Sequence, residues 1–211
     1  MRVATSTDPR QDAIAFGMAA FWAVGAWQSN TFGIWSAVGG TAVLLGIAAV
    51  VLEGTSLRRA LGLSPSSVVL GLVAGLVMVA ATYLLFGPVT QTFPVLRGGV
   101  VRLYADFGSI SLPAALIALP IVVACEDLVW RGVVYGAFAQ KMGGLAAVVA
   151  ATALYAFAHA PIGSPVLLLA CLGAGFCWNL LRWQSGSLVA AYVAHLVWDL
   201  ALLVVHPLVT P

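Results

Sequence analysis

The sequence predicts an all-α protein, a polytopic bundle of about seven membrane-spanning helices, with six to eight as the range. Two observations lead to this prediction. Of the 211 residues, 62% are hydrophobic and only 8% are charged, whereas about a quarter of the residues in soluble domains are charged. The apolar residues also gather into long runs, and a run of about 20 residues can cross the hydrocarbon core as a helix.

These runs occupy residues 13–28, 31–52, 67–86, 110–138, 145–160, 166–181 and 188–205. The polar segments between them are too short to bury a second core, so we expect residues 1–211 to form a single integral membrane domain. The formal net charge of +2 is too small to indicate a nucleic-acid partner. The expected surroundings are the lipid bilayer, and the expected location is the plasma membrane.

The first run is too long for the apolar core of a signal peptide, so we expect it to be retained. Only a few residues around Asn30 separate it from the second run, which also allows a re-entrant hairpin. With the N-terminus in the cytoplasm, most basic connections are cytoplasmic, as the positive-inside rule requires. The residues concerned are Arg58, Arg59, Lys141 and Arg182.

The third connection, residues 87–109, is the exception, because it contains Arg97 and Arg102 but is expected on the side of the membrane opposite the cytoplasm. Its apolar residues, among them Tyr104 and Phe107, alternate with polar ones. This mixture is typical of an amphipathic segment that lies on the membrane surface.

The fourth run contains three charged residues, Glu126, Asp127 and Arg131, in otherwise apolar surroundings. A charge at the bilayer centre costs about 2.5–3.5 kcal/mol, so such residues mark functional sites. Residues four apart share a helix face, so Arg131 can pair with Asp127 and support the fold. Glu126 then lacks a helical partner and points toward a neighbouring helix or a wet cavity, where it can act as a general acid or base. Alternatively, it completes a structural ion cluster.

The fifth and seventh runs add further polar residues. His159 follows Tyr155 by one helical turn, and either an interfacial role or a catalytic one fits it. His195 and Asp199 have the same spacing, which suits metal coordination, a carboxylate that orients an imidazole, or a polar contact between helices. With a rise of about 1.5 Å per residue, four residues lie at similar depths in the membrane: Glu126, His159, His195 and Asp199. We therefore expect one water-accessible cavity that they line and that opens toward the cytoplasm.

Three motifs occur in order within the core of the chain, residues 110–205. They are Glu126-Asp127-x-x-x-Arg131, Tyr155-x-x-x-His159 and His195-x-x-x-Asp199. They resemble the E-E-x-x-x-R, F-x-x-x-H and H-x-x-x-N/D motifs of the CAAX protease and bacteriocin-processing (CPBP) family, and the resemblance covers residues 110–200. Two residues depart from that pattern, since Asp127 replaces Glu and Tyr155 replaces Phe.

The resemblance implies an intramembrane endopeptidase that hydrolyses peptide bonds of membrane-associated substrates, prenylated CAAX proteins among them. By position, Glu126 would be the base that activates water and His159 its partner. His195 and Asp199 would stabilise the oxyanion or hold a metal. The supporting residues would be Asp127, Arg131 and Tyr155.

The resemblance leaves the role of a metal open. Members of the family are called metalloproteases, and His159, His195 and Asp199 would then be the ligands of a catalytic zinc ion. A mechanism based on glutamate without a metal is also proposed for the family, and the residues present suffice for either.

Two other functions stay open on sequence grounds. A catalytically silent membrane scaffold or a bacteriocin-immunity-type protein would keep the fold, and the change to Asp127 favours it slightly. The intact Glu126, His159 and His195 argue against it. A proton-coupled transporter subunit would use the ionisable residues as a relay, but a relay usually follows a path across the membrane, whereas these residues gather at one depth.

Overall fold

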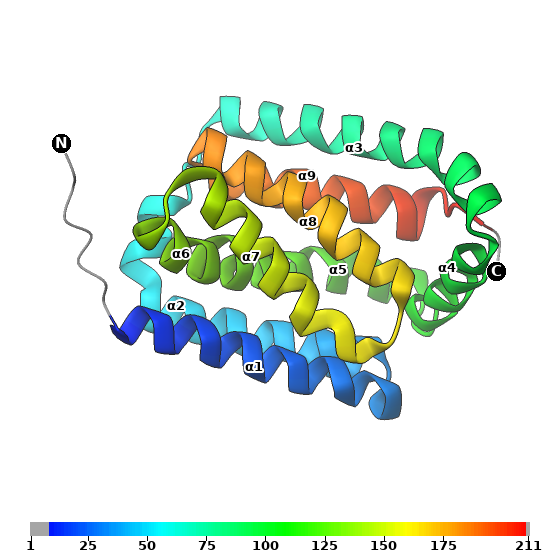
Figure 1. The fold of residues 1–211 in the computed structure, drawn as a ribbon, viewed down its shortest axis with the longest axis horizontal. Helices are drawn as coiled ribbons and strands as arrows, with labels where there is room; N and C mark the ends of the chain where they lie inside the picture. Colours follow the sequence, from blue (N-terminus) through cyan, green and yellow to red (C-terminus); the bar gives the residue numbers. More distant parts are fainter. Residues whose placement is uncertain (1–8, 210–211) are drawn as a thin grey trace.

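The computed structural model describes residues 9–209, and every regular element among them is helical (Figure 1). Six helical stretches in this part of the chain are long and apolar enough to cross a membrane. They are Trp35–Ala60, Pro65–Thr92, Leu112–Lys141, Gly144–Ile162, Pro165–Ser185 and Leu188–Val205. The predicted all-α bundle of six to eight spans is therefore confirmed, and the protein is an integral multi-pass membrane protein.

The first predicted run forms α1 (Pro9–Phe32), which is less apolar than these six stretches because its last turns contain polar residues such as Gln28. α1 and α2 (Gly40–Ala60) lie side by side and run antiparallel (Figure 1). Gly33, with a positive φ of 80°, turns the chain between them, and a π-helical turn, η1 (Trp35–Gly39), leads into α2. The first two runs are thus two long helices and not a short re-entrant hairpin.

The helix that carries the first motif lies in the centre of the bundle (Figure 1). It begins as α5 (Leu112–Asp127), continues as a π-helical segment, η2 (Leu128–Val134), and ends as α6 (Tyr135–Lys141). α2 and α9 both pack against it. Because π-helical hydrogen bonds join residues five apart, side chains around Leu128 do not follow the ordinary spacing of 3.6 residues per turn.

The other two motifs lie on α7 and α9. The C-terminal elements are α7 (Gly144–His159), the 3₁₀ turn η3 (Ala160–Ile162), α8 (Pro165–Ser185), α9 (Leu188–Asp199) and the π-helical segment η4 (Leu200–Val205). Serine side chains cap two of these helices, since the hydroxyl of Ser164 accepts from the N–H of Leu167 and that of Ser187 from the N–H of Ala190. Such caps fix where a helix begins, and therefore how deep the motif residue on α9 lies.

α3 (Pro65–Thr92) covers α9 and leaves most of its own surface to lipid. The two helices approach closely because Gly71 and Gly75 face α9. A Cβ atom at Gly71 would lie 2.6 Å from the carbonyl oxygen of Ala190. Small residues allow such close packing of membrane helices, because without a side chain the backbone of one helix can lie directly against the next helix.

α4 (Pro94–Phe107) lies at one end of the bundle (Figure 1). Val100 and Tyr104 are buried on its inner face, while Arg97 and Arg102 are exposed. The Tyr104 hydroxyl accepts a hydrogen bond from the backbone N–H of Leu208 at 3.0 Å. The third connection thus forms an amphipathic helix, as the sequence indicates.

The opposite end of the bundle, which we call the basic end, holds the ends of α2, α6 and α8 (Figure 1). Its basic residues are Arg58, Arg59, Lys141 and Arg182. Contacts tie these helix ends together: Lys141 forms an ion pair with Asp12 of α1, and the Ser187 hydroxyl donates to the carbonyl oxygen of Leu61. The cytoplasmic location of this end stays a prediction from the positive-inside rule.

Two cysteine variants test this orientation. Leu63, in the connection after α2, is 79% exposed at the basic end, and Val95, near the start of α4, is 73% exposed at the other end. Leu63→Cys should react with a membrane-impermeant maleimide only in permeabilised cells, and Val95→Cys should react in intact cells, because basic connections stay in the cytoplasm. The unsubstituted protein, with Cys125, Cys171 and Cys177, is the control for background labelling. The reverse pattern would contradict the predicted orientation.

Candidate active site

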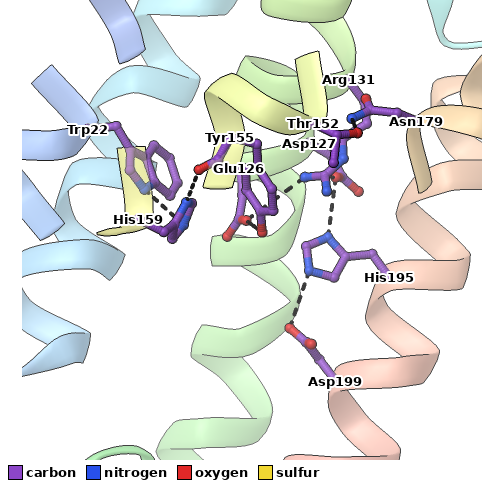
Figure 2. A network of polar contacts seen from close by, with 10 residues as sticks. All are labelled: Trp22, Glu126, Asp127, Arg131, Thr152, Tyr155, His159, Asn179, His195 and Asp199. Carbon is purple, nitrogen blue, oxygen red and sulfur yellow. Dashed lines mark hydrogen bonds and ion pairs between the residues drawn. The ribbon is translucent and has the colours of Figure 1, made fainter. Parts of the chain in front are cut away.

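Glu126 lies in the last turn of α5, where its side chain lines a cavity inside the bundle. Its carboxylate oxygen Oε1 accepts a hydrogen bond from the Tyr155 hydroxyl at 2.5 Å (Figure 2). The same oxygen lies 3.9 Å from Nη1 of Arg131. Glu126 is thus held from α7 and from η2 through one oxygen atom, Oε1.

The predicted ion pair between Asp127 and Arg131 is confirmed, with Nη1 3.1 Å from Oδ1 and both side chains buried. The prediction that Glu126 has no partner on its own helix is wrong, because the same guanidinium group also reaches Glu126. The physical reason is the π-helical segment that starts at Leu128. It brings residues five apart onto one face, so that Arg131 lies near both carboxylates.

The guanidinium group of Arg131 also contacts aromatic rings on α7 and α8. Its carbon atom Cζ lies 4.4 Å from the centre of the Tyr155 ring and 4.8 Å from that of Trp178. A desolvated cation over an aromatic face is stabilised by about 2 kcal/mol or more. Arg131 therefore holds α7 and α8 against the central helix.

His195 lies between two carboxylates. Its Nδ1 atom is 3.2 Å from Oδ1 of Asp127, and its Nε2 atom is 3.5 Å from Oδ2 of Asp199. Its ring stacks on Trp178 with the ring centres 3.7 Å apart. The pair of His195 and Asp199 suggested by the one-turn spacing is present, and Asp127 connects this pair to Arg131.

His159 uses both of its ring nitrogen atoms within the protein (Figure 2). Nε2 accepts a hydrogen bond from the indole N–H of Trp22 at 3.0 Å, and Nδ1 lies 2.8 Å from the carbonyl oxygen of Tyr155. No hydrogen bond between His159 and Glu126 is found among the described residues. The predicted partnership of these two residues in catalysis therefore stays a prediction, although both line the same cavity.

Trp22 is a site residue that sequence reasoning missed. It lies on α1, 137 positions before His159, and belongs to no motif. The only sequence signal is that a buried indole N–H usually finds an acceptor. That signal does not identify the acceptor, and it fails for Trp130, whose equally buried N–H has no partner among the described residues.

A second buried polar pair joins α7 and α8. The side-chain amide of Asn179 donates a hydrogen bond to the Thr152 hydroxyl at 3.0 Å. Thr152, Tyr155 and His159 lie on successive turns of α7 and are all buried. These side chains form one polar stripe, which faces the interior of the bundle.

A cavity of about 550 Å³ joins the predicted catalytic residues. Its polar lining residues include Glu126, Tyr155, His159, His195 and Asp199, and most of the remaining lining is apolar. Asp127 and Arg131 do not line it. The arrangement separates residues that can meet a reactant from residues that hold them in place.

The predicted opening of the cavity toward the cytoplasm stays a prediction, but the cavity does not extend toward the basic end. The cavity extends to the other end of the bundle, along the second half of α3, along α4 and along the first half of α8. Toward the basic end, small buried residues on α7 and α9, such as Ala147 and Ala190, allow the helices to pack tightly. α4 lies at the end toward which the cavity extends and lines part of it.

A family model described as type II CAAX prenyl endopeptidase Rce1-like matches residues 108–201, a segment that contains all three motifs. This segment of the chain is therefore similar to the CAAX protease family. Comparisons with curated proteins and with solved structures give no match.

The CAAX protease family also raised the expectation of zinc held by His159, His195 and Asp199. Both ring nitrogen atoms of His159 are already engaged, Nε2 as the acceptor for Trp22. Within residues 9–209, no three His, Cys, Asp or Glu side chains are grouped to hold a metal ion. The predicted ligand set does not fit this geometry.

Replacing Arg131 tests its structural role. Arg131→Ala leaves the buried Asp127 without its ion partner, which costs about 3–5 kcal/mol, so folded yield and thermal stability in detergent should fall. Arg97→Ala, on the exposed face of α4, is the matched control and should change neither. If Arg131→Ala kept its yield and melting temperature but lost turnover, Arg131 would belong to the reacting groups instead.

Gly175 of α8 makes room for Tyr155. A Cβ atom there would lie 2.9 Å from Cδ1 of the Tyr155 ring, whereas a Cβ atom at Gly173 meets nothing within 4 Å. The buried ring cannot easily yield, so Gly175→Ala should reduce the free energy of unfolding by about 1–3 kcal/mol. Gly173→Ala, on the same helix, should not. Equal melting temperatures for the two variants would show that the Tyr155 ring is not held tightly.

Proposed function

We propose that the protein is an intramembrane endopeptidase that hydrolyses peptide bonds of membrane-associated substrates, as CAAX-type proteases do. The observation that carries the proposal is the buried Glu126, which lines an apolar cavity while Tyr155 and Arg131 hold one of its oxygen atoms. The family match supports the same class of reaction.

In the proposed reaction, Glu126 is the general base. Because Tyr155 donates to Oε1, the other oxygen, Oε2, takes a proton from a water molecule in the cavity. The water oxygen attacks the carbonyl carbon of the scissile peptide, and the carbonyl oxygen becomes an oxyanion. Glu126 then returns the proton to the leaving nitrogen as the C–N bond breaks.

In the same proposal, His195 stabilises the oxyanion. Each of its ring nitrogen atoms faces a carboxylate oxygen, so each can carry a hydrogen, and an imidazole that donates from both nitrogen atoms is positively charged. The contact of Nε2 with Asp199 is long, at 3.5 Å, so a substrate oxygen that approaches Nε2 can accept this N–H in place of Asp199. Such preorganised donors supply a large part of the catalysis of acyl transfer.

The volume and the apolar lining of the cavity favour a substrate with a long apolar part. Its volume of about 550 Å³ lies within the range of about 300–1,000 Å³ that ligand pockets occupy. Side chains of α3, α4 and α8 make its walls apolar. A lipid-anchored peptide, prenylated peptides included, fits these walls with its aliphatic chain along the cavity and its peptide bond at Glu126.

The rival functions find less support. A silent scaffold has no need of a carboxylate held at the wall of a cavity, although the shorter Asp127 is the one feature that favours it. A proton relay would need ionisable groups along the whole path across the membrane. On the basic-end side of Tyr155, α7 and α8 hold the buried pair of Thr152 and Asn179, and neither side chain is ionisable.

A cleavage assay with a library of membrane peptides tests the proposal. Glu126→Gln removes the base and should reduce kcat/KM by about 100-fold or more, whereas Glu53→Gln, outside the cavity, should not. Purified enzyme should also keep its activity through exhaustive chelation.

Two results would contradict this proposal in different ways. No cleavage by the unsubstituted protein of any peptide in the library, lipid-anchored ones included, would favour the silent scaffold. Stoichiometric zinc in the purified protein, with activity lost on chelation and restored by zinc, would refute the route without a metal.

A further inference from the structure

The contact between Trp22 and His159 joins α1 to the site, although α1 lies outside the segment that matches the family model. We propose that Trp22 is a positioning residue, whose indole N–H holds His159 as a single neutral tautomer with its hydrogen on Nδ1. The consequence for turnover rests on the proposed function, whereas the hydrogen bond itself does not.

The tautomer follows from the chemistry of the two contacts. An indole N–H can only donate, so Nε2 of His159, 3.0 Å away, must present its lone pair. A backbone carbonyl can only accept, so Nδ1, 2.8 Å from the oxygen of Tyr155, must carry the hydrogen. The hydrogen bond made by one ring nitrogen decides the state of the other in many histidine sites. Here the protonation state of each nitrogen atom follows from its own contact, and the two contacts indicate the same tautomer.

The surroundings hold Trp22 in this position. Its side chain is completely buried, and its ring packs edge to face against Trp130, with centres 5.5 Å apart. The His159 ring packs against the same tryptophan pair and lies 4.4 Å from the Tyr155 ring. An aromatic cluster of this density leaves the indole little freedom to turn away.

The locked tautomer defines what His159 does in the site. While Trp22 occupies Nε2, this nitrogen can neither take up a proton nor bind a metal ion. Glu126 is then left as the base, and His159 presents a fixed neutral ring to the cavity. α1 thereby supplies a group that keeps proton transfer on a single carboxylate.

The experiment uses an analogue that removes one hydrogen and keeps the shape. β-(3-Benzothienyl)alanine carries sulfur in place of the indole N–H, and it is introduced at position 22 of the full-length protein in nanodiscs. The ¹⁵N resonances of labelled histidine report which ring nitrogen is protonated, and His159→Gln identifies the signals of His159. Trp130 is the matched control, because it touches the same cluster and its N–H has no partner among the described residues.

The unsubstituted protein should show His159 protonated at Nδ1 and unprotonated at Nε2. The analogue at position 22 should shift the Nε2 resonance and introduce a second protonation state, and the analogue at position 130 should leave the spectrum unchanged. A protonated Nε2 in the unsubstituted protein, or an unchanged spectrum with the analogue at position 22, would overturn the assignment.

An activity measurement separates this inference from the proposed function. The analogue at position 22 should lower kcat by up to about 100-fold, as small misplacements near a reacting centre do, with little change in KM. If the spectrum changes while kcat does not, Trp22 is not a positioning residue for the reaction. If the unsubstituted protein cleaves nothing, the proposed function fails, and the spectra still decide whether Trp22 sets the tautomer.

Discussion

The buried charge of Arg131 is the constraint on which the rest of the site depends. Its charge is balanced by the carboxylate of Asp127, 3.1 Å from Nη1, and by the faces of the Tyr155 and Trp178 rings. A charge taken out of water costs several kcal/mol unless its partners stay in place. Because Asp127 also contacts His195, one cation determines how α7, α8 and α9 meet the central helix.

Two adjacent carboxylates serve different purposes because the helix changes its winding between them and Arg131. Asp127 turns toward the interior and pairs with Arg131, whereas Glu126 lines the cavity and only approaches the same cation. The π-helical segment permits both contacts at once. Such segments are frequent at functional sites, and here the segment brings the guanidinium group of Arg131 near the cavity-lining carboxylate of Glu126.

The segment that matches the family model carries the three motifs, and the rest of the chain supplies much of their surroundings. α1 provides the donor to His159, while α3 and α4 provide much of the apolar wall of the cavity. All three helices lie before residue 108, where the family match begins. Differences in substrate between members of such a family can therefore arise in helices that carry none of the motifs.

The sequence by itself determined the membrane fold and the inventory of reactive groups. Long apolar runs have no stable alternative to helices in a bilayer, because every backbone polar group must be satisfied within its own segment. The spacing of four residues was sufficient to predict that Asp127 contacts Arg131 and that His195 contacts Asp199, since residues four apart lie on the same face of a helix.

Only the tertiary structure decided the contacts that cross between helices. The bonds from Tyr155 to Glu126 and from Trp22 to His159 join residues 29 and 137 positions apart, and no local periodicity encodes such distances. The end of the bundle toward which the cavity extends could likewise not be predicted from the sequence. It depends on where small side chains allow the helices to pack closely and on how α4 packs at the other end. Depth along a helix follows from counting residues, but the direction of a side chain depends on how the helices rotate and pack against one another.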